Sequence, residues 1–186
     1  RGANVTDLDG LVDTSPYLSK HSDIVALMVI EHQVTVQNLI IAANWRIRTA
    51  LADEDPDPAD IRSLVERVTE PLVEAMFFVE EAQLTAPITG TSGFRSNFVS
   101  RGPRDQTGRS LLELDLTERL FRYPLSYLIY SEAFDRMPEE ARDYVYLRLR
   151  QVLSGEDQSE QFAHLSEADR KGILEILGAT KADFVN

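Results

Sequence analysis

One long apolar segment, residues 22–48, constrains the fold of this chain more than any other feature. It reads SDIVALMVIEHQVTVQNLIIAANWRIR, which is apolar enough for a core helix. Ser22 or Asp23 can supply the side-chain oxygen that caps a helix N-terminus. We therefore predict a helix from about Asp23 to Ala52. The run Ile24–Ile30 is interrupted by Glu31, so we expect no membrane-spanning segment.

A second helix is predicted over Pro58–Gln83, with Asp57 as its cap and proline in its first turn. Its apolar residues form one face at helical spacing. Pro71 removes a backbone donor, so we expect a kink or a break there. Phe77 and Phe78 lie off the apolar face and indicate a second packing contact.

Residues 84–110 are rich in Gly, Pro, Ser and Thr, and we predict a long loop. Asp115 and Glu118 resemble a capping box before a helix with the sequence TERLFRY. After Pro124 the helix is expected to continue through LSYLIYSEAF, which is apolar on nearly every side and therefore predicted to be buried.

Two further helices are predicted near the C-terminus. One begins at Pro138, runs through Leu153 and ends at Ser154-Gly155. The other is capped by Ser166 and closed by Gly178. No segment alternates with period two. We therefore predict an all-α protein, an irregular bundle of five to six helices with one long Arg/Gly-rich loop. An irregular arm, residues 1–21, precedes a single helical domain, residues 22–186.

Composition excludes several functions. A formal net charge of −12 argues against nucleic acid and anionic membranes, because both attract clustered Lys and Arg. The absence of cysteine removes disulfides, thiolate metal sites, cysteine nucleophiles and covalent c-type haem attachment. The chain also lacks a phosphate-binding P-loop, a dinucleotide fingerprint and the G-x-S-x-G elbow of serine hydrolases.

Polar residues inside the first helix are the first candidate site. A helical projection places Glu31, Thr35 and Asn38 on one stripe among apolar residues, and His32 between other apolar residues. One interpretation is that Glu31, His32 and Glu132 converge as a metal or acid–base site, suited to iron, manganese or zinc. The other is a buried hydrogen-bonded network that fixes the helix register.

A non-covalent haem is a further alternative to the transition metal. It would use His32, with a methionine sulfur from Met28 or Met76 as the second ligand. In the leading interpretation, no cofactor is expected.

The loop is the second candidate site. It carries four arginines against a single acid, Asp105; the arginines are Arg95, Arg101, Arg104 and Arg109. Arginine forks bind carboxylates and phosphates in bidentate fashion, which indicates a docking site for an anionic ligand or an acidic partner. The alternative is that these arginines pair with the protein's own acids and fix the loop in place.

The runs SDIVALMVIEHQ, GRSLLELDL and RLFRYPLSYLIYSEAF resemble segments of uncharacterised bacterial exported proteins. The resemblance implies a periplasmic or extracellular location, but neither a mechanism nor site residues. We therefore expect the chain to be the C-terminal part of a longer exported protein. The expected function is a non-enzymatic structural or protein-binding module within a larger protein or complex. The alternative is a metal- or haem-dependent, redox-linked protein using Glu31, His32 and Glu132.

Overall fold

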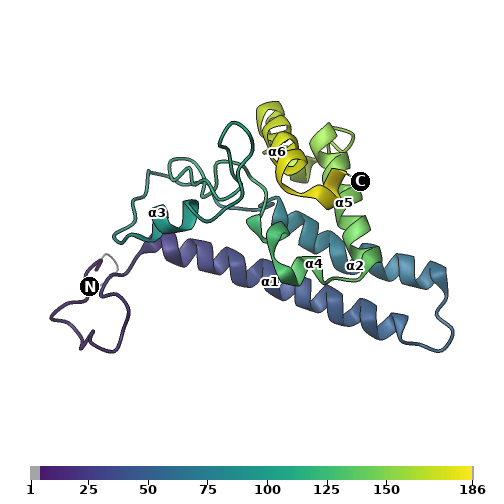
Figure 1. Cartoon of the computed structure of the whole chain (residues 1–186), viewed down its shortest axis with the longest axis horizontal. Coiled ribbons are helices and arrows are strands. Elements are labelled where there is room, and N and C mark those ends of the chain that lie inside the picture. Colours follow the sequence, from purple (N-terminus) through teal and green to yellow (C-terminus); the bar gives the residue numbers. More distant parts are fainter. Residues whose placement is uncertain (1–4, 186) are drawn as a thin grey trace.

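The computed structural model describes residues 5–185, and within this range the chain is mostly helical and has no strands. Its frame is a hairpin of two long helices, α1 (Ile24–Leu51) and α2 (Pro58–Met76). Figure 1 shows that they run side by side, with the remaining helices and the long loop on one side of α1. Both caps agree with the sequence: Asp23 accepts hydrogen bonds from the amides of Val25 and Ala26, and Asp57 from that of Ala59.

The second helix is shorter than predicted, because it ends at Met76 instead of Gln83. It is not broken at Pro71, whose side chain is exposed. The chain leaves the helix through two left-handed residues, Phe78 (φ 59°) and Glu80 (φ 66°). This turn sends Phe77 into the main core and Phe78 into a separate cluster, which confirms a second packing contact.

The middle of the chain differs most from the prediction. Residues 84–110 contain a short helix, α3 (Phe94–Val99). The segment TERLFRY is not helical; Asp115 caps a tight turn instead, and Leu114 and Phe121 form an isolated antiparallel bridge. LSYLIYSEAF is divided into a 3-10 turn, η1 (Tyr127–Tyr130), and one helical turn, α4 (Glu132–Asp135).

Two serines explain this division. Ser126 accepts a hydrogen bond from the amide of Leu128, and Ser131 accepts one from that of Phe134. Each serine thereby begins a new element. A residue that caps a helix N-terminus has extended backbone, so the preceding helical element cannot continue through it. The prediction that the segment is buried holds for its apolar side chains, since Leu128, Ile129 and Phe134 are buried.

The C-terminal helices agree more closely with the sequence. The fifth helix, α5 (Glu139–Ser154), ends at Gly155 with φ 80°. It is followed by a 3-10 turn, η2 (Glu160–Phe162), and by α6 (Glu167–Thr180), which begins with a complete capping box. Gly178 does not close α6, which continues to Thr180 before the final turn, α7 (Ala182–Val185).

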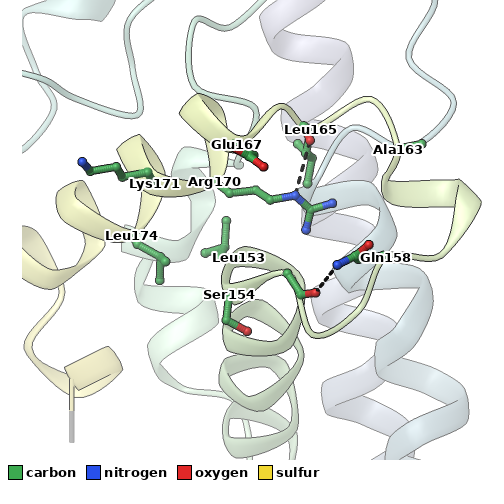
Figure 2. A pocket seen from close by; sticks show the side chains of 10 residues that line it. Leu153, Ser154, Gln158, Ala163, Leu165, Glu167, Arg170, Lys171 and Leu174 are labelled. Carbon is green, nitrogen blue, oxygen red and sulfur yellow. Dashed lines mark hydrogen bonds between the residues drawn. The ribbon is translucent and has the colours of Figure 1, made fainter.

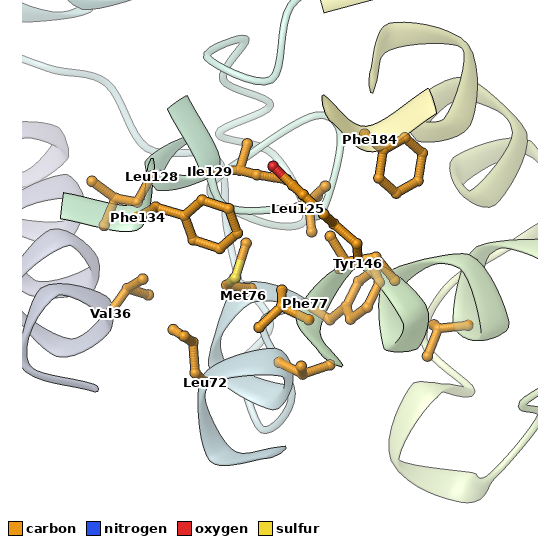
Figure 3. Packing of buried hydrophobic residues seen from close by; sticks show 14 of the residues in the cluster. Val36, Leu72, Met76, Phe77, Leu125, Leu128, Ile129, Phe134, Tyr146 and Phe184 are labelled. Carbon is orange, nitrogen blue, oxygen red and sulfur yellow. The ribbon is translucent and has the colours of Figure 1, made fainter. Parts of the chain in front are cut away.

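The buried side chains form two clusters. The larger lies where α1, α2, α5 and α6 meet the segment 123–137, and Figure 3 shows its aromatic and aliphatic side chains in contact. The smaller fixes the loop region to the N-terminal half of α1; it comprises Val25, Val29, Phe78, Leu114, Leu116, Leu120 and Phe121. This second cluster positions the loop residues described next.

Candidate anion-binding site

The structure does not bring the proposed metal ligands together. Glu31 lies on the exposed side of α1, and Glu132 is exposed on α4, where it forms an ion pair with Arg136. His32 points inward. Among residues 5–185 no group of three or more His, Asp or Glu side chains is placed to hold a metal ion. The described geometry therefore does not bring Glu31, His32 and Glu132 together as one site.

The environment of His32 is that of a core residue. Its Nε2 lies 2.8 Å from Ser126 Oγ, and its ring stacks on Phe78 at a centroid distance of 4.2 Å. Burial lowers the pKa of His32 to about 4, so the ring is neutral at neutral pH. Of the two methionines considered for haem, Met76 is fully buried in the main cluster. A hydrogen-bonded core histidine accounts for these contacts.

The polar stripe of α1 is exposed, whereas the helical projection placed it among buried apolar residues. Glu31, Thr35 and Asn38 are exposed, so they do not form a buried network. The projection was wrong because it assumed that apolar neighbours are buried. Leu27 and Trp45, which flank the stripe, are 56% and 74% exposed.

The α1 helix also differs from the membrane expectation. By length and composition alone it is long and apolar enough to cross a membrane. Only 22% of its most apolar window is buried inside the fold. The same length and composition occur in core helices of soluble proteins and in signal sequences, so this property alone assigns no location.

Two of the four loop arginines fix the loop itself. Arg104 donates hydrogen bonds to the carbonyls of Gly108 (2.6 Å) and Val99 (2.8 Å). Arg109 binds Asp105 and Glu175, both at 2.7 Å, and so ties the loop to α6. For these two residues the structural alternative applies.

Asp105 is the centre of the loop. Its burial opposes ionisation, but hydrogen bonds from the amides and side chains of Arg109 and Thr107 outweigh burial and lower its pKa to about 2. The carboxylate is therefore charged at neutral pH and holds both residues. A loop fixed in this way keeps its remaining arginines in defined positions.

The other two loop arginines are exposed. Among the described residues, neither Arg95 nor Arg101 forms an ion pair. Arg95 projects from α3 into two adjacent hollows, whereas Arg101 lines neither of them. The structure thus separates the four arginines into two that fix the loop and two that form no ion pair, of which only Arg95 lines these hollows.

The first hollow, which we call the α3 hollow, has a volume of about 490 Å³. Its lining consists of one side of α3 together with Arg104, Glu113, Leu114 and Arg122. Glu113 is its only acid, and it lies 3.6 Å from Arg104 and 3.8 Å from Arg122. Arginines therefore outnumber acids in this hollow.

The second, the α6 hollow, has a volume of about 800 Å³ and shares Arg95, Leu114 and Arg122 with the first. Its other cations are mostly neutralised. Arg119 binds Asp169 at 2.6 Å, as Arg109 binds Glu175. Arg95 and Arg122 are the two cations that line both hollows. In the described part of the chain Arg95 forms no ion pair, and Arg122 forms a single loose one, with Nε 3.8 Å from Glu113.

Sequence reasoning missed Arg122, because it placed this residue on a helix. The residue instead follows Phe121 in the extended bridge. Successive side chains point to opposite faces in extended backbone, so burial of Phe121 turns Arg122 outward. The position of this charged residue between two buried aromatic residues, Phe121 and Tyr123, would have been the signal.

A further hollow, between the end of α5 and the start of α6, is a structural junction (Figure 2). Its cation, Arg170, donates from Nη2 to the carbonyl of Phe162 at 3.0 Å, and from Nη1 to that of Val152. These bonds satisfy carbonyls at the end of α5 and in the following turn. Arg170 is therefore already occupied by the backbone.

Comparison of the chain with protein-family models, with curated proteins and with solved structures finds no match in any of the three.

Proposed function

We propose that this chain is a non-enzymatic binding module, and that the hollows lined by Arg95 and Arg122 dock an acidic segment of another protein. The observation that carries the proposal is the pair of guanidinium groups that line both hollows: among the described residues Arg95 forms no ion pair, and Arg122 has only the loose pair with Glu113 at 3.8 Å.

The chemistry of the two side chains favours carboxylates. An arginine fork presents two parallel N–H donors to one carboxylate, and such charge-assisted bonds are stronger than neutral ones. Arg122 also lies over the Tyr123 ring, 5.7 Å from its centroid, which holds the guanidinium against an apolar floor. The Asp105 centre and the second cluster keep both arginines on a rigid support.

The net charge favours a protein over a nucleic acid as the partner, because the rest of the surface would repel a long phosphate chain. An extended acidic segment would lie across both hollows, since they adjoin at Leu114. Together with the resemblance to exported bacterial proteins, this supports a module of a larger extracytoplasmic protein or complex.

The test is a titration with a fluorescent ten-residue glutamate peptide. The wild type is expected to bind it, and Arg122→Glu is expected to weaken binding by about tenfold or more, as the loss of a charged hydrogen bond predicts. Arg67→Glu, at an exposed position on α2, makes the same charge change away from the hollows and is the matched control. Equal weakening by both substitutions would show that only the net charge matters and would contradict the proposal.

A further inference from the structure

One side of α1 carries large apolar side chains that no part of the described chain covers. The opposite side, which includes Val36, Ile40 and Ile47, is buried in the main core. The outer side presents Ile24, Leu27, Val34, Ile41 and Trp45, each between 46% and 74% exposed. Figure 1 shows α1 along the edge of the molecule, with the other helices on one side of it. The helix is therefore apolar on two sides, and one of them has no partner among residues 5–185.

The exposed residues follow a heptad repeat. Three polar residues, Glu31, Asn38 and Arg48, lie on the same line. Together with the five apolar residues they recur along α1 at alternating steps of three and four residues. All eight are exposed. Such spacing places one seam along a helix and is the pattern by which two helices pack together. We call these eight residues the α1 seam.

The three polar residues of the seam select the orientation of a partner helix. In a parallel pair of identical helices, Glu31 would face the partner's Glu31 and Arg48 the partner's Arg48, which is repulsive. In an antiparallel pair, Glu31 can face the partner's Arg48. The same register sets Val34 opposite the partner's Trp45 and Asn38 opposite the partner's Ile41. Each contact occurs twice, because a two-fold axis relates the copies.

The flanking positions agree with this register. Ile30 would lie beside the partner's Leu51, and Gln37 beside the partner's Asn44, so apolar residues meet apolar residues and amides meet amides. Arg48 retains donors for the partner, since it uses Nε for Asn44 and Nη2 for the carbonyl of Arg136. Shifting the register by one heptad would set Glu31 opposite the partner's Ile41 and Arg48 opposite the partner's Ile24.

From this charge and apolar complementarity we infer that the α1 seam binds the α1 seam of a second copy of this chain in antiparallel orientation. A lipid surface is the competing occupant. The seam fits it less well, because Glu31, Asn38 and Arg48 would enter the apolar layer unpaired. Exposed apolar stripes of this extent mark interaction surfaces in general.

The chain contains no cysteine, which makes disulfide crosslinking a direct test. In the proposed register, the double variant Val34→Cys/Trp45→Cys is expected to form a covalent dimer under mild oxidation. Neither single variant should do so, because two copies of either residue would be about 16 Å apart along the helix axis. Crosslinking of a single variant would indicate a parallel seam and overturn the inference.

A second measurement, which needs no cysteine variant, tests the same inference if those variants fail to fold. Sedimentation equilibrium should show that the wild type is a dimer. The substitution Ile41→Glu should raise the dissociation constant of this dimer by about tenfold or more. Leu147→Glu, at an exposed apolar position on α5, is the matched control and should leave the dimer unchanged. A wild type that is monomeric at every concentration, or that binds neutral phosphatidylcholine vesicles as a monomer, would overturn the inference.

Discussion

The imidazole of His32 and the hydroxyl of Ser126 are joined by a 2.8 Å hydrogen bond between two parts of the chain that are distant in sequence. Ser126 also begins η1, by accepting a hydrogen bond from the amide of Leu128. The pair therefore fixes the start of the 127–135 segment against α1. Because His32 also stacks on Phe78, its neutral form is part of the packing of the second cluster.

The stability of the fold is expected to fall as the pH decreases from about 6.5 to 4. The pKa of His32 is lowered from 6.5 to about 4 by burial, so between these values the unfolded chain binds a proton that the folded chain does not. This difference favours unfolding by up to about 3 kcal/mol at the acid end of the range. Urea unfolding at pH 7 and pH 5 measures it, with about 2 kcal/mol expected from His32 over that interval.

The variant His32→Gln should be less stable than the wild type at pH 7, by about 1–2 kcal/mol, because it loses ring packing. It should also lose most of the pH dependence between pH 7 and pH 5. His21→Gln, on the exposed N-terminal arm, is the control and should unfold as the wild type does at both values. A His32→Gln variant that keeps the full pH dependence would show that another group is responsible.

Arg148 is expected to be the ion-paired residue whose loss most destabilises the fold. It binds Glu70 of α2 through two nitrogens and Asp157 of the following loop, and its side chain is 15% exposed. In Arg148→Met both carboxylates lose this cation, which should cost about 3 kcal/mol of unfolding free energy. Arg148→Lys should recover only part of this, because an ammonium group is not a fork.

The measurement is again urea unfolding at pH 7. Arg67→Met, at an exposed position on α2, serves as the control and should change stability by less than about 0.5 kcal/mol. If Arg148→Met were as stable as the wild type, the ion pairs would contribute no more to stability than well-packed apolar contacts.

The turn after α2 should be stabilised by glycine at position 80. Glu80 has φ 66° and is exposed, and a side chain in this left-handed region costs about 1 kcal/mol. Glu80→Gly removes that cost and should raise the unfolding free energy by about 0.5 kcal/mol, after allowance for the greater freedom of glycine in the unfolded chain. Glu80→Ala removes the same charge but keeps a Cβ atom. It should give no such gain, and an equal gain in both variants would assign the effect to charge.

The helix starts were predictable where a cap acts on its own neighbours. Asp23, Asp57 and Ser166 all cap the helices that the sequence indicated, because their hydrogen bonds reach only two or three residues ahead. The same logic failed at Asp115. Its side chain binds the amides of the following residues as in a helix, but those residues form a turn held by the bridge between Leu114 and Phe121. A local signal does not distinguish the two outcomes.

The candidate site was only partly predictable for a related reason. Arg95 and Arg109 stand out by composition, but only the fold shows that Arg109 is neutralised by Glu175 of α6, whereas Arg95 faces a hollow. Arg122 becomes a neighbour of Arg95 through the bridge, which sequence periodicity did not indicate. Glu31 and Asn38 were misplaced because apolar residues beside them, such as Trp45, lie on the surface.

The most direct test of the docking proposal measures the affinity of two variants for the same glutamate peptide, one expected to bind it more weakly than the wild type and the other more tightly. The double variant Arg95→Glu/Arg122→Glu reverses the charge of the two cations that line both hollows. Glu113→Gln removes the negative charge of the one acid that lines the α3 hollow, but keeps a side-chain oxygen that can accept the hydrogen bond from the Ser110 amide. The account predicts that the double variant loses detectable binding and that Glu113→Gln binds the peptide about threefold to tenfold more tightly than the wild type. Unchanged affinity in both variants, with their folds intact by circular dichroism, would contradict it.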